Sequence, residues 1–252
     1  MVRGLERFRD AFAAHVHQYT LIGGTACALL LEQVDLPFRA TKDLDIVLMS
    51  EMLDTSFART FWEFVRAGRY KVAESTDGTP KFYRFCAPQD TDFPSMMELF
   101  STSPERLPSA PGLSLTPIPI DGLVSSLSAI LLDETYYAFL KAGVRLVDGL
   151  SVVGPEHLVP LKARAWLDLK QRKAKGREMD SKDINKHRKD VFRLYQIVDP
   201  APLRDTPQVV AADMRRFLTE VRAETIDLKT LGIARISLDE VLAQLGRIYG
   251  VG

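Results

Sequence analysis

The chain has 252 residues, 46% of them hydrophobic and 26% charged, which is typical of a globular protein able to bury a sizeable core. Its 33 basic and 33 acidic residues balance, so the molecule as a whole exerts no strong attraction on a polyanion. No apolar run approaches the roughly 20 residues that span a bilayer, and the N-terminus lacks the apolar block of a signal peptide, which predicts a cytoplasmic protein with no membrane partner.

The first half of the chain alternates helix-like and strand-like patterns. Apolar residues at helical spacing predict an amphipathic first helix, and an almost wholly apolar run after a Gly-Gly pair predicts a buried second helix. Period-two patterns bounded by turn residues predict the strands. The predicted elements are a helix at 5–19, a strand at 19–22, a helix at 25–33, a strand at 40–48, a helix at 57–67, strands at 70–73, 81–85 and 95–100, and an irregular loop at 104–119.

The second half of the chain is predicted to be mainly helical. Over 124–132 and 136–142 the periodicity does not decide between short helices and short strands. A hairpin is predicted over 144–153, and Pro155 opens a long helix because proline is tolerated in the first turn. The pattern predicts an α/β (α+β) protein with two domains, at 1–154 and 155–252.

A pair of carboxylates lies on the predicted strand that follows the Gly-Gly pair. In Asp43-Leu44-Asp45 the alternation of a strand places both acids on one face and turns Leu44 into the core. Two adjacent carboxylates repel each other unless a cation lies between them. Oxygen-only ligands that leave room for water and substrate phosphates suit Mg²⁺. Asp43 and Asp45 are therefore predicted metal ligands, with a solvated strand end as the alternative.

The Gly-Gly pair itself is the candidate phosphate site. Gly23 and Gly24 let backbone N–H groups approach a phosphate closely, and the helix N-terminus adds its partial positive charge. Thr25 is predicted to donate a hydroxyl hydrogen bond to the terminal phosphate. The alternative is an ordinary strand-to-helix turn with no ligand.

These motifs together resemble the nucleotidyltransferase superfamily. Gly23-Gly24-Thr25-Ala26 followed by Thr41-Lys42-Asp43-Leu44-Asp45 is similar to its AbiEii-type branch, which includes toxins of bacterial toxin–antitoxin and abortive-infection systems. The resemblance implies a polymerase beta-like fold, with a mixed central sheet flanked by helices and a helical C-terminal domain. It implies transfer of a nucleoside monophosphate from an NTP with two Mg²⁺ ions, or Mn²⁺ in their place. It also implies an RNA acceptor such as the tRNA 3′ end, a role in phage defence and a cognate antitoxin.

The resemblance also selects three residues outside the first motif. Glu98, in Met96-Met97-Glu98-Leu99-Phe100, matches the third metal-binding carboxylate, because a charge among apolar neighbours is costly unless it is paired or liganded. The alternative places Glu98 on an edge strand, facing solvent. Lys162 matches a lysine that neutralises charge on the triphosphate.

Asp183 matches a later functional carboxylate, either the base for the acceptor hydroxyl or an organiser of Lys162. The alternative makes Asp183 a first-turn acid favoured by the helix dipole. Lys186 stands where some relatives have another Asp, so Asp190 is kept as a substitute for Asp183.

Positive charge is concentrated in one segment. Between 162 and 193, twelve basic residues stand against five acidic ones, a surplus of seven that favours a polyanionic partner such as RNA. Two other functions stay open: a nucleotide- or partner-binding protein of the same fold without turnover, and an antibiotic-modifying nucleotidyltransferase. The second ranks lower because a cationic drug requires an acidic acceptor pocket.

Overall fold

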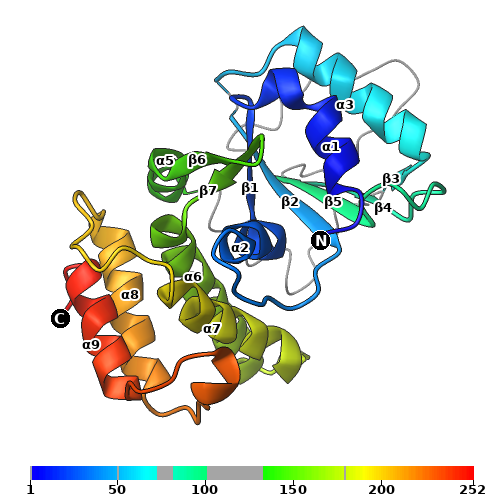
Figure 1. Cartoon of the computed structure of the whole chain (residues 1–252). Helices are drawn as coiled ribbons and strands as arrows, with labels where there is room; N and C mark the ends of the chain where they lie inside the picture. Colours follow the sequence, from blue (N-terminus) through cyan, green and yellow to red (C-terminus); the bar gives the residue numbers. More distant parts are fainter. Residues whose placement is uncertain (1, 50, 73–81, 101–132, 179) are drawn as a thin grey trace. The chain divides into compact units, whose positions relative to one another are not determined.

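The computed structural model describes residues 2–49, 51–72, 82–100, 133–178 and 180–252 (Figure 1). The predicted loop at 104–119 and the undecided stretch at 124–132 lie outside the described residues. The described residues divide into two compact units, each treated separately below. The first comprises the described part of 2–100 together with 144–153, and the second comprises 133–143 together with 154–252.

The first unit is built on a mixed sheet, which in the described residues has seven strands in the order β3-β4-β5-β2-β1-β7-β6. Strand β2 runs parallel to β5 and β1 runs parallel to β7, while the other neighbouring pairs are antiparallel. The strands are β1 (Tyr19–Ile22), β2 (Asp43–Leu48), β3 (Lys71–Val72), β4 (Phe82–Cys86), β5 (Met96–Phe100), β6 (Val144–Val147) and β7 (Leu150–Val153). The mixed sheet and its helices confirm the predicted α/β class.

Helices α1 (Leu5–Ala11), α2 (Gly23–Glu32) and α3 (Thr55–Gly68) belong to this unit, with a short 3₁₀ turn at Ala13–His15. The first helix is shorter than predicted, because the chain leaves the helix at Phe12 and turns into β1. Helix α2 begins two residues earlier than predicted, at the first glycine of the pair. Strand β2 begins later than predicted, at the first of the two aspartates.

One face of the sheet is covered by aromatic side chains from α1 and α3. Phe8 of α1 meets Tyr19 of β1 edge to face, with ring centroids 5.3 Å apart. Phe61 of α3 meets Phe85 of β4 in the same way at 5.2 Å. Such pairs add to the free energy gained by burying apolar area, so the aromatic side chains on this face help to stabilise the first unit.

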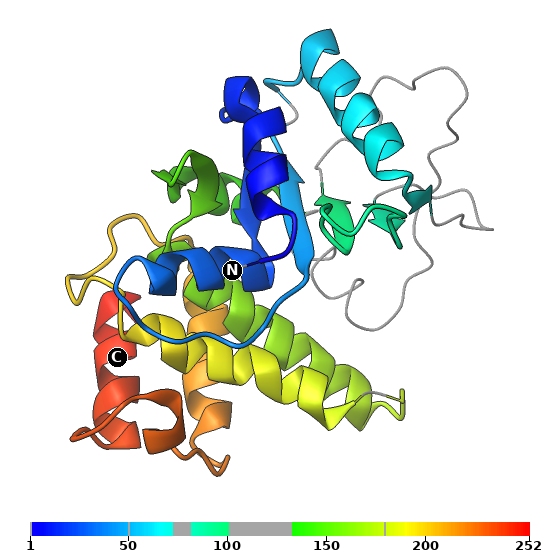
Figure 2. The ribbon, with the colours of Figure 1, turned by 45° about the vertical axis from the view of Figure 1, so that its right-hand side comes forward.

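The second unit is helical in its described residues. Its helices are α5 (Glu134–Ala142), α6 (Pro155–Ala174), α7 (Ser181–Tyr195), α8 (Gln208–Val221) and α9 (Leu238–Ile248), with a 3₁₀ turn at Lys229–Leu231. Helices α6 and α7 pack along one another (Figure 2). Among the described helices, none is both long and apolar enough to cross a membrane.

Helix α5 resolves the undecided pattern at 136–142, and it groups with the second unit. The predicted boundary at 154 assigned it to the N-terminal domain. The grouping has a physical cause, because the buried hydroxyl of Tyr136 donates a 2.7 Å hydrogen bond to Asp213 of α8. Burial and the neighbouring carboxylate raise the pKa of Tyr136 above its ordinary value, which keeps this donor protonated.

Candidate functional site

The turn from β1 into α2 requires glycine at its first position. Gly23 has φ +69°, and a Cβ atom built on it would lie only 1.6 Å from Oδ2 of Asp45. The Asp45 carboxylate therefore lies directly against the backbone of this turn, in space that any other residue would fill. At Gly24 a Cβ atom would come within 2.7 Å of Oγ1 of Thr41 and 3.3 Å of Nη2 of Arg39. The Asp45 carboxylate, the Thr41 hydroxyl and the Arg39 guanidinium thus converge on the N-terminus of one helix.

The hydroxyl of Thr25 has a different partner from the predicted one. It donates a 2.7 Å hydrogen bond to the backbone carbonyl of Asp43, and the residue is fully buried. A hydroxyl has a single proton to donate, so in the structure this group fastens α2 to the start of β2. The hydrogen bond from Thr25 to a phosphate stays a prediction, and it requires this hydroxyl to leave the Asp43 carbonyl.

The register of the sheet aligns charged residues in one row. Asp45 lies opposite Ile22 of β1 and opposite Glu98 of β5, and Glu98 lies opposite Arg84 of β4. Residues directly opposite one another project from the same face, and Asp43, two residues before Asp45, shares that face. The row therefore runs from the glycine turn through Asp45 and Glu98 to Arg84, on the face opposite the aromatic core.

Glu98 is buried in the interior of the sheet. Strand β5 lies between β2 and β4, and Glu98 is 4% exposed, so the alternative of a solvent-facing edge position is wrong. Its Oε1 atom accepts from Nε of Arg84 at 2.6 Å and contacts Nη2 at 2.5 Å. Arg84 was not predicted as a site residue. The available signal was a charged residue at the middle position of the apolar strand Phe82–Cys86.

The donor chemistry of the row fits a hard divalent cation, because its acidic side chains offer oxygen ligands alone. Asp43 and Asp45 are half-buried and so retain access from one side. Within the part of the chain that the structure describes, no three His, Cys, Asp or Glu side chains are grouped closely enough to hold a metal ion. The structure thus brings the three predicted ligands onto one face, while the Glu98 carboxylate is held by Arg84.

Lys162 and Asp190 form a buried ion pair between α6 and α7. The Nζ atom of Lys162 lies 3.2 Å from Oδ2 of Asp190, and the residues are 2% and 0% exposed. Arg193 lies 3.5 Å from the other oxygen of Asp190. Asp183 is farther out on α7, more than one-third exposed, and pairs with Lys186 at 3.1 Å. Of the two acids considered for this region, Asp190 is the partner of Lys162.

The twelve basic residues between 162 and 193 differ in their partners. Six of them face carboxylates, in the pairs Lys162–Asp190, Arg164–Asp213, Lys170–Glu224, Lys186–Asp183, Arg188–Glu224 and Arg193–Asp190. Arg172 is half-buried, Lys173 is exposed and contacts the Ser181 hydroxyl, and Lys189 is exposed on α7. Lys175, Arg177 and Lys182, at the turn from α6 to α7, are exposed, and no described carboxylate pairs with them. We call these three residues the α6–α7 basic turn.

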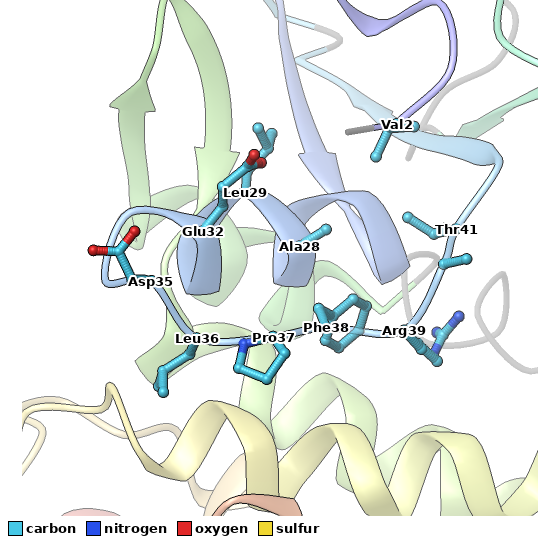
Figure 3. Close-up of a pocket in the computed structure, with 11 residues that line it drawn as sticks. Val2, Ala28, Leu29, Glu32, Asp35, Leu36, Pro37, Phe38, Arg39 and Thr41 are labelled. Carbon is cyan, nitrogen blue, oxygen red and sulfur yellow. The ribbon is translucent and has the colours of Figure 1, made fainter.

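A pocket of about 540 Å³ lies between α2 and the segment that follows it (Figure 3). Ala28 and Leu29 of α2 form one wall, and Phe38, Arg39 and Thr41 lie along the other. The Arg39 guanidinium also lies over the ring of Phe38, 5.1 Å from its centroid. Arg39 and Thr41 also approach Gly24, so one end of this pocket adjoins the glycine turn.

No protein-family model matches the sequence, and no curated protein matches it. The fold resembles an antigenic nucleotidyltransferase-like protein from Paracoccidioides brasiliensis, with a TM-score of 0.47, 14% identity, and coverage of 95% of this chain and 98% of that one. It also resembles the Megavirus polyadenylate synthase (TM-score 0.41, 11% identity, 88% of this chain and 36% of that one). A third similar structure is JHP933 from Helicobacter pylori (TM-score 0.40, 14% identity, 98% and 88%). All three TM-scores are below 0.5, and none of these likenesses assigns an activity to the chain.

Proposed function

We propose that this protein is a nucleotidyltransferase, which transfers a nucleoside monophosphate from an NTP to an acceptor hydroxyl. The observation that carries the proposal is the position of Asp45. Its carboxylate lies against the glycine turn at the N-terminus of α2, with Glu98 beside it on the next strand. A helix N-terminus attracts phosphate and carboxylates attract the cations that accompany it, so this juxtaposition suits a metal-bound nucleotide.

In the proposed reaction the acceptor oxygen attacks the α-phosphorus of the NTP. A new P–O bond forms, the bond to the β-phosphate oxygen breaks, pyrophosphate leaves and the acceptor proton is lost. The backbone N–H groups of Gly23 and Gly24 hold the triphosphate, because the absence of side chains allows close approach. Asp43, Asp45 and Glu98 would hold two Mg²⁺ ions, or Mn²⁺, which supply neutralising charge at the phosphates.

Lys162 is proposed to neutralise charge on the departing pyrophosphate. Its buried pair with Asp190 supports an organising role for Asp190, since the contact fixes the ammonium in one place. Asp183 remains proposed as the base for the acceptor hydroxyl, and its partial exposure leaves it open to an incoming substrate.

The proposed acceptor is RNA, with the tRNA 3′ end as the specific site implied by the resemblance. The support on this chain is the α6–α7 basic turn, because its three charges are exposed close together in the sequence, while basic side chains such as Arg164, Lys170 and Arg188 face carboxylates. In a molecule with no net charge, such a local cluster is where a polyanion would bind. A role as the toxin of a phage-defence pair with a cognate antitoxin belongs to the same proposal.

A second function is favoured by one observation. Because Arg84 holds the Glu98 carboxylate, a protein that kept this pair permanently would bind nucleotide without turning it over. Calorimetry with each NTP, combined with the transfer assay below, separates the two functions. Nucleotide binding without any product in the presence of Mg²⁺ would select the binding protein.

The transfer assay uses purified protein, each radiolabelled NTP, Mg²⁺ and total RNA. We expect label to enter RNA with wild-type protein and to fall by about 100-fold or more with Asp43→Asn, because a metal-binding charge is lost. Asp92→Asn is the matched control, since this aspartate of the same unit is 75% exposed and pairs with Arg7 only at 3.9 Å. The proposed enzymatic function is rejected if wild type transfers no label with any NTP and acceptor, or if Asp43→Asn transfers as much label as wild type.

The acceptor is tested separately by RNA binding without NTP. Replacing Lys175, Arg177 and Lys182 by Glu is expected to weaken RNA binding and to reduce its salt dependence by about two units of log–log slope, at about 0.7 per phosphate contact. The control triple replaces Arg204, Arg215 and Arg235, which are exposed elsewhere in the same unit. Equal losses in both triples would show a general charge effect and reject the turn as an RNA site.

A further inference from the structure

We propose that Arg84 is an exchangeable counter-ion of Glu98. It holds this carboxylate while no divalent cation is present, and it releases the carboxylate when a cation binds. The freed guanidinium then binds the phosphates of the nucleotide. The inference rests on the proposed nucleotide site, and it adds a positioning residue that none of the sequence motifs contains.

The first step is the location of the pair. Arg84 and Glu98 stand opposite each other on β4 and β5, and Glu98 stands opposite Asp45 on β2. Three carboxylates, Asp43, Asp45 and Glu98, therefore share this face, and Arg84 lies opposite the third of them.

The second step is the geometry of the contact. Two of the three guanidinium nitrogens, Nε and Nη2, approach the same oxygen, Oε1, at 2.6 and 2.5 Å. The observed contact therefore concentrates positive charge at one oxygen, as a bound cation does.

The third step is the difference in freedom of the two side chains. The Glu98 side chain is 5% exposed and the Arg84 side chain is 19% exposed, so the carboxylate is enclosed while the guanidinium retains an open side. A divalent cation carries twice the charge of a guanidinium, and the two repel when they share one oxygen. Arginine is also well suited to phosphate, because its planar fork matches phosphate oxygens.

The test measures cation binding alone, without nucleotide or turnover. Mn²⁺ is titrated into the full chain and the free ion is measured by electron paramagnetic resonance. Removing a competing charge should tighten Mn²⁺ binding, so Arg84→Gln is expected to bind about threefold to tenfold more strongly than wild type. Glu98→Gln should bind Mn²⁺ more weakly than wild type. The double variant Arg84→Gln/Glu98→Gln should match Glu98→Gln, because without the Glu98 carboxylate Arg84 no longer competes with the cation for a ligand. A separate measurement, of transfer rate against NTP concentration, tests the contact with phosphate: Arg84→Gln should raise the KM for NTP by about tenfold.

The matched control is Arg66→Gln, an exposed arginine of α3, the helix that packs against the aromatic face. It reports the effect of removing one positive charge without touching Glu98. Arg84→Gln binding Mn²⁺ no better than Arg66→Gln would overturn the proposal. So would an Arg84 effect that persists undiminished in the Glu98→Gln background.

A measurement on wild-type protein covers the case in which Arg84→Gln fails to fold. The Nε–H resonance of Arg84, assigned by ¹⁵N nuclear magnetic resonance, should move when Mg²⁺ is added and should be unaffected by Mg²⁺ in Glu98→Gln. No movement in wild type overturns the exchange. Failure of the transfer assay alone, with these cation effects present, would reject the enzymatic function and leave the exchange standing.

Discussion

The two faces of the sheet differ in chemistry although the same strands supply both. On one face, Leu44, Leu99 and Phe85 are buried, and the ring of Phe85 packs against Phe61 of α3. On the other face, at adjacent positions of the same strands, lie Asp45, Glu98 and Arg84. A step of one residue along β2 or β5 thus moves from the core to the candidate site.

This contrast indicates how the unit tolerates a concentration of acid in a buried sheet. The aromatic face supplies apolar burial over several strands, so the opposite face can carry repelling carboxylates. Stability and chemistry are divided between neighbouring residues. Substitutions at adjacent positions should therefore have opposite effects, and the following predictions use that division.

The largest effect is expected from Asp45→Asn. The amide keeps the shape of the side chain but removes the charge beside the glycine turn, so transfer should fall by about 100-fold to 1,000-fold. The free energy of unfolding should stay within about 1 kcal/mol of wild type, because relief of carboxylate repulsion offsets lost hydrogen bonding. Radiolabel transfer and urea denaturation measure the two quantities. A large loss of stability would contradict the division between the faces.

The neighbouring substitution, Leu44→Ala, should do the reverse. Leu44 is fully buried on the aromatic face, so its truncation should cost about 2–5 kcal/mol of unfolding free energy. The fraction that remains folded should keep most of its transfer activity per molecule. Urea denaturation gives the loss, and activity is normalised to the folded fraction. A specific activity reduced as strongly as in Asp45→Asn would show that the faces are coupled.

Local patterns in the sequence were sufficient for part of this arrangement. The alternation of Asp43-Leu44-Asp45 predicted which side chains share a face, and the register confirms it. The strand containing Glu98 was predicted because its apolar neighbours have strand character. Both are consequences of the two-residue period, which depends on nothing distant in the chain.

Long-range pairing was beyond the reach of those patterns. The contact of Arg84 with Glu98 depends on the strand order, and that of Lys162 with Asp190 on the packing of two helices. The hydroxyl of Thr25 was assigned to a phosphate because its actual partner, a backbone carbonyl on β2, becomes a neighbour only after the turn has folded. Residues selected by motif can therefore be placed correctly on an element while their partners are still unknown.

A smaller effect on stability is expected from Gly23→Ala, which tests the close approach of the Asp45 carboxylate to the glycine turn. The new Cβ atom would lie 1.6 Å from Oδ2 of Asp45, so the carboxylate must move. We expect a loss of about 1–3 kcal/mol for alanine at positive φ, together with a clear loss of transfer. Gly250→Ala is the control, because it has φ +64° and nothing within 4 Å of its added Cβ atom. Equal transfer by the two variants would show that the position of the Asp45 carboxylate does not matter.

The last effect is confined to alkaline pH and concerns Tyr19 on the aromatic face. Burial raises the pKa of Tyr19 to about 12. An unfolded tyrosine ionises near pH 10, so the unfolded state releases its proton first. The contribution of the protonated Tyr19 to the free energy of unfolding is complete below pH 10. It is lost as the pH rises to 12, and the loss amounts to about 3 kcal/mol at most.

Tyr19→Phe removes this proton release, so the variant should gain stability relative to wild type between pH 10 and 12. Urea denaturation at pH 8 and at pH 11.5 measures the change, and the difference between the two proteins at pH 8 serves as the reference. Other buried tyrosines, among them Tyr70, also have a raised pKa, so wild type and variant should both weaken at high pH. If the difference in free energy of unfolding between the two proteins did not change with pH, the Tyr19 hydroxyl would be in contact with water. The aromatic face of the sheet would then be open to solvent at this position.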